Sequence, residues 1–478
     1  GRYPLSAVGD INTYQVFAGL VRQIVGPEGR VGIIVPSGIA TDYYNQDYFD
    51  AVVQNHELVS LYDFENKLAL FPEVAPVMKF CLLTLCGEAV PIDEMDFAFF
   101  LTQADQLADE DRHFSLAPED LRRINPNTGS CPTFRNRKDA NLTRKLYRAT
   151  PVMINEQTEQ NPWNVSFFTM FHMTNDSNLF RTGEQLQSED CRKHGGGLIS
   201  DGEIYQPLYE AKFVQQFDHR NGTFAGLSGD SVFKTKAATY TPRESEKSNP
   251  EYVVVPRFWV SNQAVDEATP VDWQQRWFVG FRDIIQPMTN ARCAIFTVIP
   301  RVAVGNQLPM ILPRVDATVD ISAMIGCLNS FVFDFVARQK IGGSHLNFYI
   351  VKQLPILPLE RYTTDLLEFI VSRVIELTYT AWDLQPFAED VLDEVGEETW
   401  TRWFASDHLG SPAPVHTSPP PDWAPGTTPP PFVWDEERRA RLRAELDALY
   451  GHLYGLTREE LAYILDTFPI VRRKDEAE

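Results

Sequence analysis

The sequence predicts a mixed fold of the α/β and α+β classes: a partial doubly wound (Rossmann-like) sheet, then a mixed α/β region and C-terminal helices. Three observations lead to this prediction. Short apolar runs bounded by turn residues alternate with helical patterns over the first part of the chain. From about residue 125 the chain becomes rich in aromatic residues, Asn, Gln and turns. Helical periodicity returns at Ile321 and recurs towards the end of the sequence.

The first segment alternates helices and strands. Either Asp10 or Asn12 is placed to cap a helix that reaches Val25. The run Arg30–Val35 is short, continuous and apolar, which predicts a strand buried on both faces of a parallel sheet. We also expect a helix at Tyr43–Asn55 and strands at Glu57–Phe64 and Met78–Leu85. So few strands predict an incomplete sheet.

The last third of the chain is predicted to be mainly helical. One helix is expected at Ile321–Arg338, and others at Asp365–Thr380, Asp435–Tyr450 and Thr457–Leu465. Thr457 and Glu460 have the spacing of a capping box at the start of the last of these. Between them, Ser411–Pro431 is rich in Pro, Ser and Thr, which predicts an extended loop.

Composition limits the possible classes of function. A chain of 478 residues is too long for one ordinary core, so it should form two or three domains. The net charge of −22 taken alone argues against nucleic acid, because phosphate binding needs Lys and Arg. Basic residues nevertheless cluster between Arg135 and Arg148, either as a DNA-binding face or as an ordinary solvated helix face.

Two further classes of site or location receive little support. The six cysteines form no CxxC pair, so no metal site is expected, and their use suits the cytoplasm. No apolar run is long enough to span a bilayer, so we expect no membrane partner.

Several longer phrases occur in a definite order. The first are Gly29-Arg-Val-Gly-Ile-Ile-Val-Pro-Ser-Gly38, Leu61-Tyr-Asp-Phe-Glu65, Phe71-Pro72 and Met78–Leu83. The later ones are Asn125–Thr128 with Phe134-Arg135, Tyr209–Lys212 with Gln216–Arg220, and Leu328–Asp334 continuing through Arg338–Gly343, His345–Asn347 and Gln353–Pro358. Together they resemble the PglX-like and type IIG restriction–modification methyltransferases, which modify adenine in DNA in phage-defence systems.

The resemblance implies a division of the chain. Residues 1–124 would be the C-terminal half of a class I methyltransferase domain, with the phrase at Gly29–Gly38 similar to its fifth strand and following turn. Residues 125–360 would be the DNA target-recognition domain, and residues 361–478 a helical region with the Pro-rich loop at 411–431.

The chain departs from the family in its catalytic elements. The family holds S-adenosylmethionine with a glycine-rich loop and the target adenine with an Asn-Pro-Pro-aromatic tetrapeptide, and neither occurs in this sequence. Asn161-Pro162-Trp163 is similar but has one proline and follows the strands at a distance. We therefore expect no cofactor on this chain and no methylation by it alone. The intact parent enzyme would use S-adenosylmethionine and would need the missing N-terminal catalytic half, in the same chain or a separate one.

The resemblance also directs the choice of candidate site residues. Pro36 and Ser37 end a strand, where ligands of α/β folds bind, so they could border the target-base pocket or simply form a turn. Lys and Arg can hold phosphates, and Asn, Gln, Arg and Lys can read base edges. The DNA-binding candidates on these grounds are Arg135, Lys138, Asn175, Arg181, Lys212, Gln216, His219, Arg220, Arg338, Lys340, Gly342, Gly343, Ser344, His345 and Asn347.

Two other functions remain open from the sequence. Asp201 with Glu210-Ala211-Lys212 has the layout of a PD-(D/E)xK nuclease, in which carboxylates hold magnesium. A non-enzymatic scaffold that binds other defence-system proteins would suit the acidic segments and the Pro-rich loop. Double-stranded DNA is the expected partner under the first hypothesis, in the cytoplasm of a bacterium.

Overall fold

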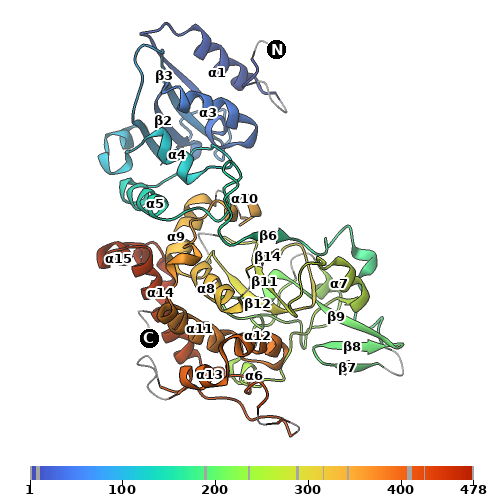
Figure 1. The fold of residues 1–478 in the computed structure, drawn as a ribbon. Coiled ribbons are helices and arrows are strands. Elements are labelled where there is room, and N and C mark those ends of the chain that lie inside the picture. The colour runs from blue at the N-terminus through green and yellow to red at the C-terminus, as the bar shows by residue number, and fades with distance from the viewer. Residues whose placement is uncertain are drawn as a thin grey trace. The chain divides into compact units, whose positions relative to one another are not determined.

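The computed structural model describes residues 3–6, 11–187, 191–234, 237–286, 290–315, 317–341, 344–405, 412–421, 423–424 and 426–475. The chain forms two compact units (Figure 1). Unit 1 consists of residues 1–160 and 349–355, and unit 2 of residues 161–348 and 356–478. The mixed α/β class with C-terminal helices is confirmed. The helical segment that follows residue 361 belongs to unit 2, together with the strands between residues 161 and 348. The functional division at residues 124 and 360 stays a prediction.

Unit 1 is built on one mixed sheet with the strand order β1-β3-β2-β4-β5. Its strands are β1 (Arg30–Pro36), β2 (Leu58–Glu65), β3 (Lys79–Cys86), β4 (Met95–Leu101) and β5 (Phe114–Leu116). Its helices are α1 (Thr13–Ile24), α2 (Gly38–Thr41), α3 (Gln46–Gln54), α4 (Pro118–Ile124) and α5 (Arg137–Ala149). Asn12 and Gln15 form the capping box that begins α1, and Phe97 and Phe114 stack in the core at 5.6 Å.

The prediction that the strand at Arg30–Val35 is buried in a parallel sheet was wrong. β1 lies at the edge of the sheet and pairs antiparallel with β3 from Arg30↔Cys86 to Pro36↔Phe80. Its residues alternate in exposure, and the Ile34 side chain is 55% exposed. β2 also runs antiparallel to β3, so β1 and β2 point the same way with a reversed strand between them.

Unit 2 contains two sheets and a layer of helices (Figure 1). One sheet has the order β10-β9-β8-β7, with β13 beside β9, and the other has the order β12-β11-β14-β6. The strands are β6 (Val165–Phe168), β7 (Arg192–His194), β8 (Gly197–Ser200), β9 (Glu203–Tyr209), β10 (Trp259–Ser261), β11 (Trp277–Phe281), β12 (Phe296–Pro300), β13 (Ala303–Val304) and β14 (Met310–Pro313).

The C-terminal helices of unit 2 pack mainly on one another, whereas the helix at Asn262–Ala268 packs on β9 and β10. They are α6 (Glu244–Lys247), α7 (Asn262–Ala268), α8 (Thr318–Leu328), α9 (Phe331–Lys340), α11 (Thr364–Thr378), α12 (Gln385–Val395), α13 (Glu397–Trp403), α14 (Glu436–Leu453), α15 (Arg458–Asp466) and α16 (Pro469–Asp475). The short helix α10 (Phe348–Lys352) begins at the last residue before the chain returns to unit 1. α8 lies against α11, and α14 lies against both α9 and α11.

The single helix expected at Ile321–Arg338 is in fact two helices, which is a second correction. α8 ends at Leu328, and α9 starts at Phe331 with its axis bent by 59°. Ser330 causes the restart, because its hydroxyl caps α9 by accepting a hydrogen bond from the Phe333 amide at 3.2 Å. Among the described residues no single helix is long and apolar enough to cross a membrane, although this bent pair passes on length and composition.

Gly326 tests how tightly α8 packs. A Cβ atom at this position would lie 2.7 Å from the Tyr450 Oη atom, and that fully buried hydroxyl donates to the Ala323 carbonyl at 2.6 Å. We expect Gly326→Ala to lower the free energy of unfolding by about 1–3 kcal/mol, because Tyr450 has no room to move. Denaturant titration of the single and double variants checks this. Adding Tyr450→Phe should give a smaller loss than the sum of the two changes, and strict additivity would contradict the clash.

Candidate nucleic-acid interface

The candidate DNA-binding residues divide by exposure. Side chains on the surface are Arg135, Lys138, Asn175, Arg181, Ser344 and His345. Half-buried positions are Pro36, Lys212, Arg338, Lys340 and Asn347. Buried ones are Ser37, Gln216, His219 and Arg220. Gly342 and Gly343 lie outside the described residues.

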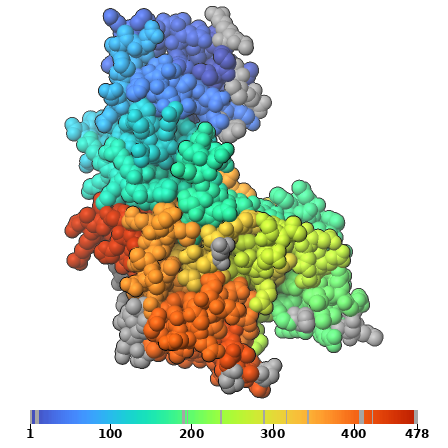
Figure 2. All heavy atoms as spheres, in the orientation of Figure 1, coloured from blue at the N-terminus to red at the C-terminus, as the bar shows by residue number. Residues whose placement is uncertain are grey.

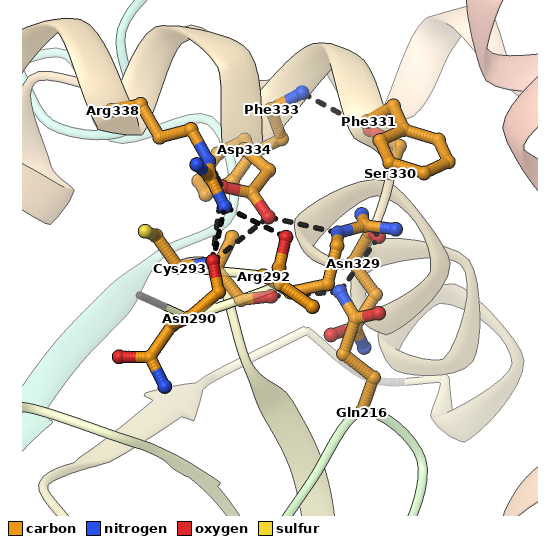
Figure 3. A network of polar contacts seen from close by, with 12 residues as sticks. Gln216, Asn290, Arg292, Cys293, Asn329, Ser330, Phe331, Phe333, Asp334 and Arg338 are labelled. Atoms are coloured by element: carbon orange, nitrogen blue, oxygen red, sulfur yellow. Dashed lines mark hydrogen bonds and ion pairs between the residues drawn. The ribbon is translucent and has the colours of Figure 1, made fainter. Parts of the chain in front are cut away.

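The most specific phrase of the sequence, Leu328–Asp334, forms a buried polar network (Figure 3). The Asp334 carboxylate is fully buried and accepts hydrogen bonds from Arg292 Nε at 2.8 Å, Arg338 Nε at 3.2 Å and the Cys293 amide at 3.0 Å. Asn329 binds the backbone of Phe296 in both directions, each at 3.0 Å. These contacts attach α9 to the segment that leads into β12, so this phrase stabilises the fold.

Arg338 belongs to that network rather than to an open surface. Its guanidinium donates to the carbonyls of Asn290 at 3.0 Å and Ala291 at 2.7 Å, and it lies 4.3 Å from the centre of the Phe468 ring. With Asp334 as a third partner, the cation is compensated and only partly accessible. Its expected role as a direct DNA contact is therefore replaced by a role in holding the end of α9.

The backbone of residues 344–346, which follow α9, is held by hydrogen bonds, and the Ser344 and His345 side chains are exposed. The Ile285 amide donates to the Ser344 carbonyl at 3.0 Å, and the Leu346 amide donates to the Asp283 carbonyl at 2.8 Å. The exposed His345 ring places Nδ1 2.9 Å from the Asp283 carboxylate, which fixes the orientation of the imidazole. Ser344 and His345 thus present polar atoms from a fixed backbone, which is what reading of base edges requires.

The candidates at Gln216–Arg220 hold unit 2 together, and this corrects their expected role. Arg220 is 0% exposed, and its guanidinium donates to the carbonyls of Lys247 at 2.9 Å, Tyr252 at 3.0 Å and Thr380 at 3.0 Å. His219 lies 2.8 Å from the Asp383 carboxylate, and the Gln216 amide donates to the Ala294 carbonyl at 2.7 Å. None of the three side chains is accessible to DNA in this structure.

The nuclease layout is also engaged in structural contacts. Arg257 donates to both carboxylate oxygens of Glu210, from Nε to Oε1 at 2.7 Å and from Nη2 to Oε2 at 2.8 Å. Lys212 lies 3.2 Å from Glu210 and 4.8 Å from the centre of the Phe224 ring, and burial lowers its pKa. Among the described residues no group of three or more His, Cys, Asp or Glu side chains could hold a metal ion. With both of its oxygens bound by Arg257, Glu210 is not free to act as a magnesium ligand.

Asn175 and Arg181 lie on a segment of unit 2 beside β10, the edge strand of the sheet β10-β9-β8-β7. The Arg181 backbone exchanges hydrogen bonds with Trp259, at 2.9 Å and 2.7 Å, and its guanidinium donates to the Asn178 carbonyl at 2.8 Å. Both side chains are exposed, so they remain candidates for DNA contact.

In unit 1 the sheet places Ser37 and Asp63 together at the ends of β1 and β2. The Ser37 hydroxyl donates to the Asp63 carboxylate, and both side chains are buried. Burial raises the pKa of the Asp63 carboxyl, while the hydrogen bond from Ser37 acts in the opposite direction. The Ser37 hydroxyl therefore donates to Asp63 and not to a ligand.

Arg135 lies close to the same end of the sheet. Its guanidinium is 4.7 Å from the centre of the Phe100 ring, and Lys79 Nζ is 5.1 Å from it. Phe100 has a φ of 58°, a strained conformation for an aromatic residue, and its amide donates to Asp63 at 3.4 Å. Between β2 and β3 an apolar loop lies open to solvent, with exposed side chains at Leu68, Leu70, Phe71, Val74, Val77 and Met78.

Sequence reasoning missed this apolar loop and two arginines, Arg122 and Arg123, in the last turn of α4. The apolar loop could have been found as a run of large hydrophobic residues between two strands with no helical or strand period. The two arginines are consecutive in a short helix, and only the packing of α5 beside it brings further basic side chains close to them.

Comparisons with known proteins give distant structural matches. No family model and no curated protein sequence matches the chain. The type IIG restriction endonuclease BpuSI is 9% identical with a TM-score of 0.29, covering 96% of this chain and 51% of that one. The type IIL restriction–modification enzyme MmeI in complex with DNA is 8% identical with a TM-score of 0.37, covering 96% and 52%. The ATP-dependent type ISP enzyme LlaBIII bound to DNA is 8% identical with a TM-score of 0.33, covering 78% and 27%.

The chain therefore spans about half the length of the first two proteins that it matches. Because these identities and TM-scores are low, we take neither fold nor function from them.

Asp334 tests the network around α9. Asp334→Asn would place an amide donor against the guanidinium of Arg292 and leave two partly buried arginines without their carboxylate. We expect the free energy of unfolding to fall by about 3–5 kcal/mol, as for loss of one partner of a buried ion pair. Chemical denaturation measures it, with Asp393→Asn on the exposed side of α12 as the matched control. Equal stability of the two variants would refute the role given to Asp334.

Proposed function

We propose that this chain is the DNA-recognition part, joined to the end of the methyltransferase sheet, of an S-adenosylmethionine-dependent adenine-specific DNA methyltransferase. The enzyme would belong to a bacterial restriction–modification or phage-defence system and act in the cytoplasm. The observation that carries the proposal is the open edge of β1. The strand that resembles the fifth methyltransferase strand has a partner on one side only among the described residues.

An open edge of this kind calls for a partner. Its unpaired backbone groups can accept another strand, and isolated edges of soluble proteins are usually covered or charged. Apolar side chains add to it: Ile34 on β1 is 55% exposed, and Phe17 and Ile24 on the adjacent α1 are 57% and 69% exposed. We assign this surface to the missing N-terminal catalytic half, which would supply the remaining strands, in the same chain or in a separate one.

The residues of this chain do not make a complete cofactor site. The glycine-rich loop and the Asn-Pro-Pro-aromatic tetrapeptide are absent from the sequence, and Ser37 and Asp63 are buried against each other. S-adenosylmethionine supplies the methyl group in the proposed parent enzyme, and we derive no transfer step through this chain. Pro36 and the open apolar loop between β2 and β3 stand at the same end of the sheet as Ser37, where the target-base pocket of the parent is proposed.

DNA reading is assigned to unit 2. Ser344 and His345 are exposed on a loop whose backbone is fixed by Asp283 and Ile285. Polar side chains on a fixed backbone can discriminate base edges in the major groove. Asn175 and Arg181 offer a second exposed polar segment.

The test is binding to duplex DNA. We expect the chain to select sequences from a pool of randomised duplexes, with an affinity that falls as salt rises. His345→Ala should reduce discrimination between selected and unselected duplexes by about 1–3 kcal/mol and leave the salt dependence unchanged, as expected for a base contact. His452→Ala, an exposed histidine on α14, is the control and should change neither.

Other outcomes decide between the alternatives. A folded chain that binds no duplex at low salt but retains a protein partner would favour a scaffold. Magnesium-dependent cleavage of plasmid that Glu210→Gln abolishes would favour the nuclease.

A further inference from the structure

Unit 1 carries a concentration of positive charge in a chain that is acidic as a whole. Arg122 and Arg123 lie in the last turn of α4, and Arg144, Lys145 and Arg148 lie along α5. The two helices pack against each other, so the five side chains come from neighbouring elements. Figure 2 shows the segment that contains both helices, in teal, at the surface of unit 1. We call the surface formed by these five residues the α4–α5 surface.

The α4–α5 surface is hollowed along its length. A hollow of about 390 Å³ is lined by Asn141, Arg144, Lys145 and Arg148. A second, of about 510 Å³, shares Arg148 with the first and adds Arg122 and Arg123. A third, of about 480 Å³, shares Arg122 with the second and extends to Asn125–Gly129. The shared lining residues show that the three hollows adjoin one another, and we refer to the three together as the track.

One buried carboxylate fixes part of this charge without cancelling it. Asp120 is 2% exposed and accepts three hydrogen bonds from Arg148, at 2.8 Å and 3.0 Å to Oδ1 and at 3.2 Å to Oδ2, while Arg144 lies 3.8 Å away. A single carboxylate thus orients two guanidinium groups, which leaves a net positive charge. Arg122 and Arg123 are exposed and form no ion pair with any residue that the structure describes.

The size and charge of this track match a nucleic-acid backbone. α5 has 13 residues and is about 20 Å long, while each DNA strand advances about 3.4 Å per phosphate. The helix therefore extends past about six nucleotides of one strand. Glu119 on α4 lines the second hollow beside Arg122, Arg123 and Arg148, and Asp47 and Asp50 on α3 line the third beside Arg122. Cations therefore outnumber carboxylates among the residues that line the first and second hollows, which are the parts suited to an anionic ligand.

We propose that the α4–α5 surface binds the phosphate backbone of double-stranded DNA, independently of sequence, through Arg122, Arg123, Arg144, Lys145 and Arg148. This inference rests on the proposed DNA-recognition function and gives unit 1 a share in it. The guanidinium groups that Asp120 orients form a preorganised pair, and Arg122 and Arg123 add two exposed cations that form no ion pair with a described residue. Phosphate contacts of this kind set the position of the duplex, while base contacts elsewhere set the sequence.

The test removes two charges from the surface without touching Asp120. Arg122→Ala with Arg123→Ala should weaken binding to a fluorescent duplex of scrambled sequence about 10-fold or more near 0.1 M salt. The slope of log K against log salt should become shallower by about 1.8, or 0.9 for each lost phosphate contact. Replacement of both residues by Lys should restore most of the affinity, because the charge is kept.

The control removes the same amount of charge from unit 2. Arg441→Ala with Arg458→Ala changes two exposed arginines of α14 and α15, and it should leave affinity and slope within twofold of the unaltered chain. Circular dichroism confirms that each variant is folded. If the unaltered chain binds duplex DNA and the Arg122/Arg123 variant binds equally well, this surface is not the site, while the proposed function survives.

Two further results overturn the assignment. If the folded, unaltered chain binds no duplex at low salt, both the proposed function and this inference fail. If single-stranded RNA binds more tightly than the duplex and loses the same affinity in the variant, the surface serves RNA and the assignment to duplex DNA is wrong.

Discussion

The fold of unit 2 depends on the burial of one carboxylate, that of Asp334, between two arginines. An ionised group with no exposure is costly unless several donors replace its lost water. Asp334 meets that requirement with Arg292, Arg338 and the amide of Cys293, which come from two places in the chain. The hydrogen bonds that satisfy the Asp334 carboxylate hold α9 against the segment that precedes β12. The adjacent Asn329 then ties the end of α8 to the same strand, so the break between the helices is fixed as well.

This constraint explains why the recognisable phrases of the sequence are so polar and yet so little exposed. Arg220 and Arg338 are of a residue type that often contacts DNA, but the guanidinium of each donates hydrogen bonds to carbonyl or carboxylate acceptors within unit 2. Arginine suits this role because its five donors form a fixed planar fork. The residues left for a ligand are those on the loops that these networks support, such as Ser344 and His345. A polar framework thus gives the exposed loop a fixed backbone, and recognition needs that rigidity.

The features that the sequence predicts well are those decided locally. The helices at Asp365–Thr380 and Thr457–Leu465 appear as α11 and α15, because helical period and the capping box of Thr457 with Glu460 act within a few residues. The strand at Arg30–Val35 exists as expected, but its neighbour and exposure depend on β3, which is more than 40 residues further along the chain.

Non-local partners also explain the misplaced site residues. The carbonyls that accept hydrogen bonds from buried Arg220 belong to Lys247, Tyr252 and Thr380, and no spacing in the sequence predicts that these residues come together. Arg122 and Arg123 were missed for a related reason, since only the packing of α4 against α5 brings the cations of α5 close to theirs.

The net charge of the chain is likewise a poor guide to the charge of one local surface. Charges on the surface are screened beyond about 8–10 Å. A phosphate on the α4–α5 surface therefore responds mainly to its five cations and to the carboxylates that lie beside them, rather than to the net charge of the whole chain. Those carboxylates are Asp120, Glu119, Asp47 and Asp50. A chain with a charge of −22 can therefore present a local site for DNA, and the strength of that site should depend on salt far more than the base contacts of unit 2 do.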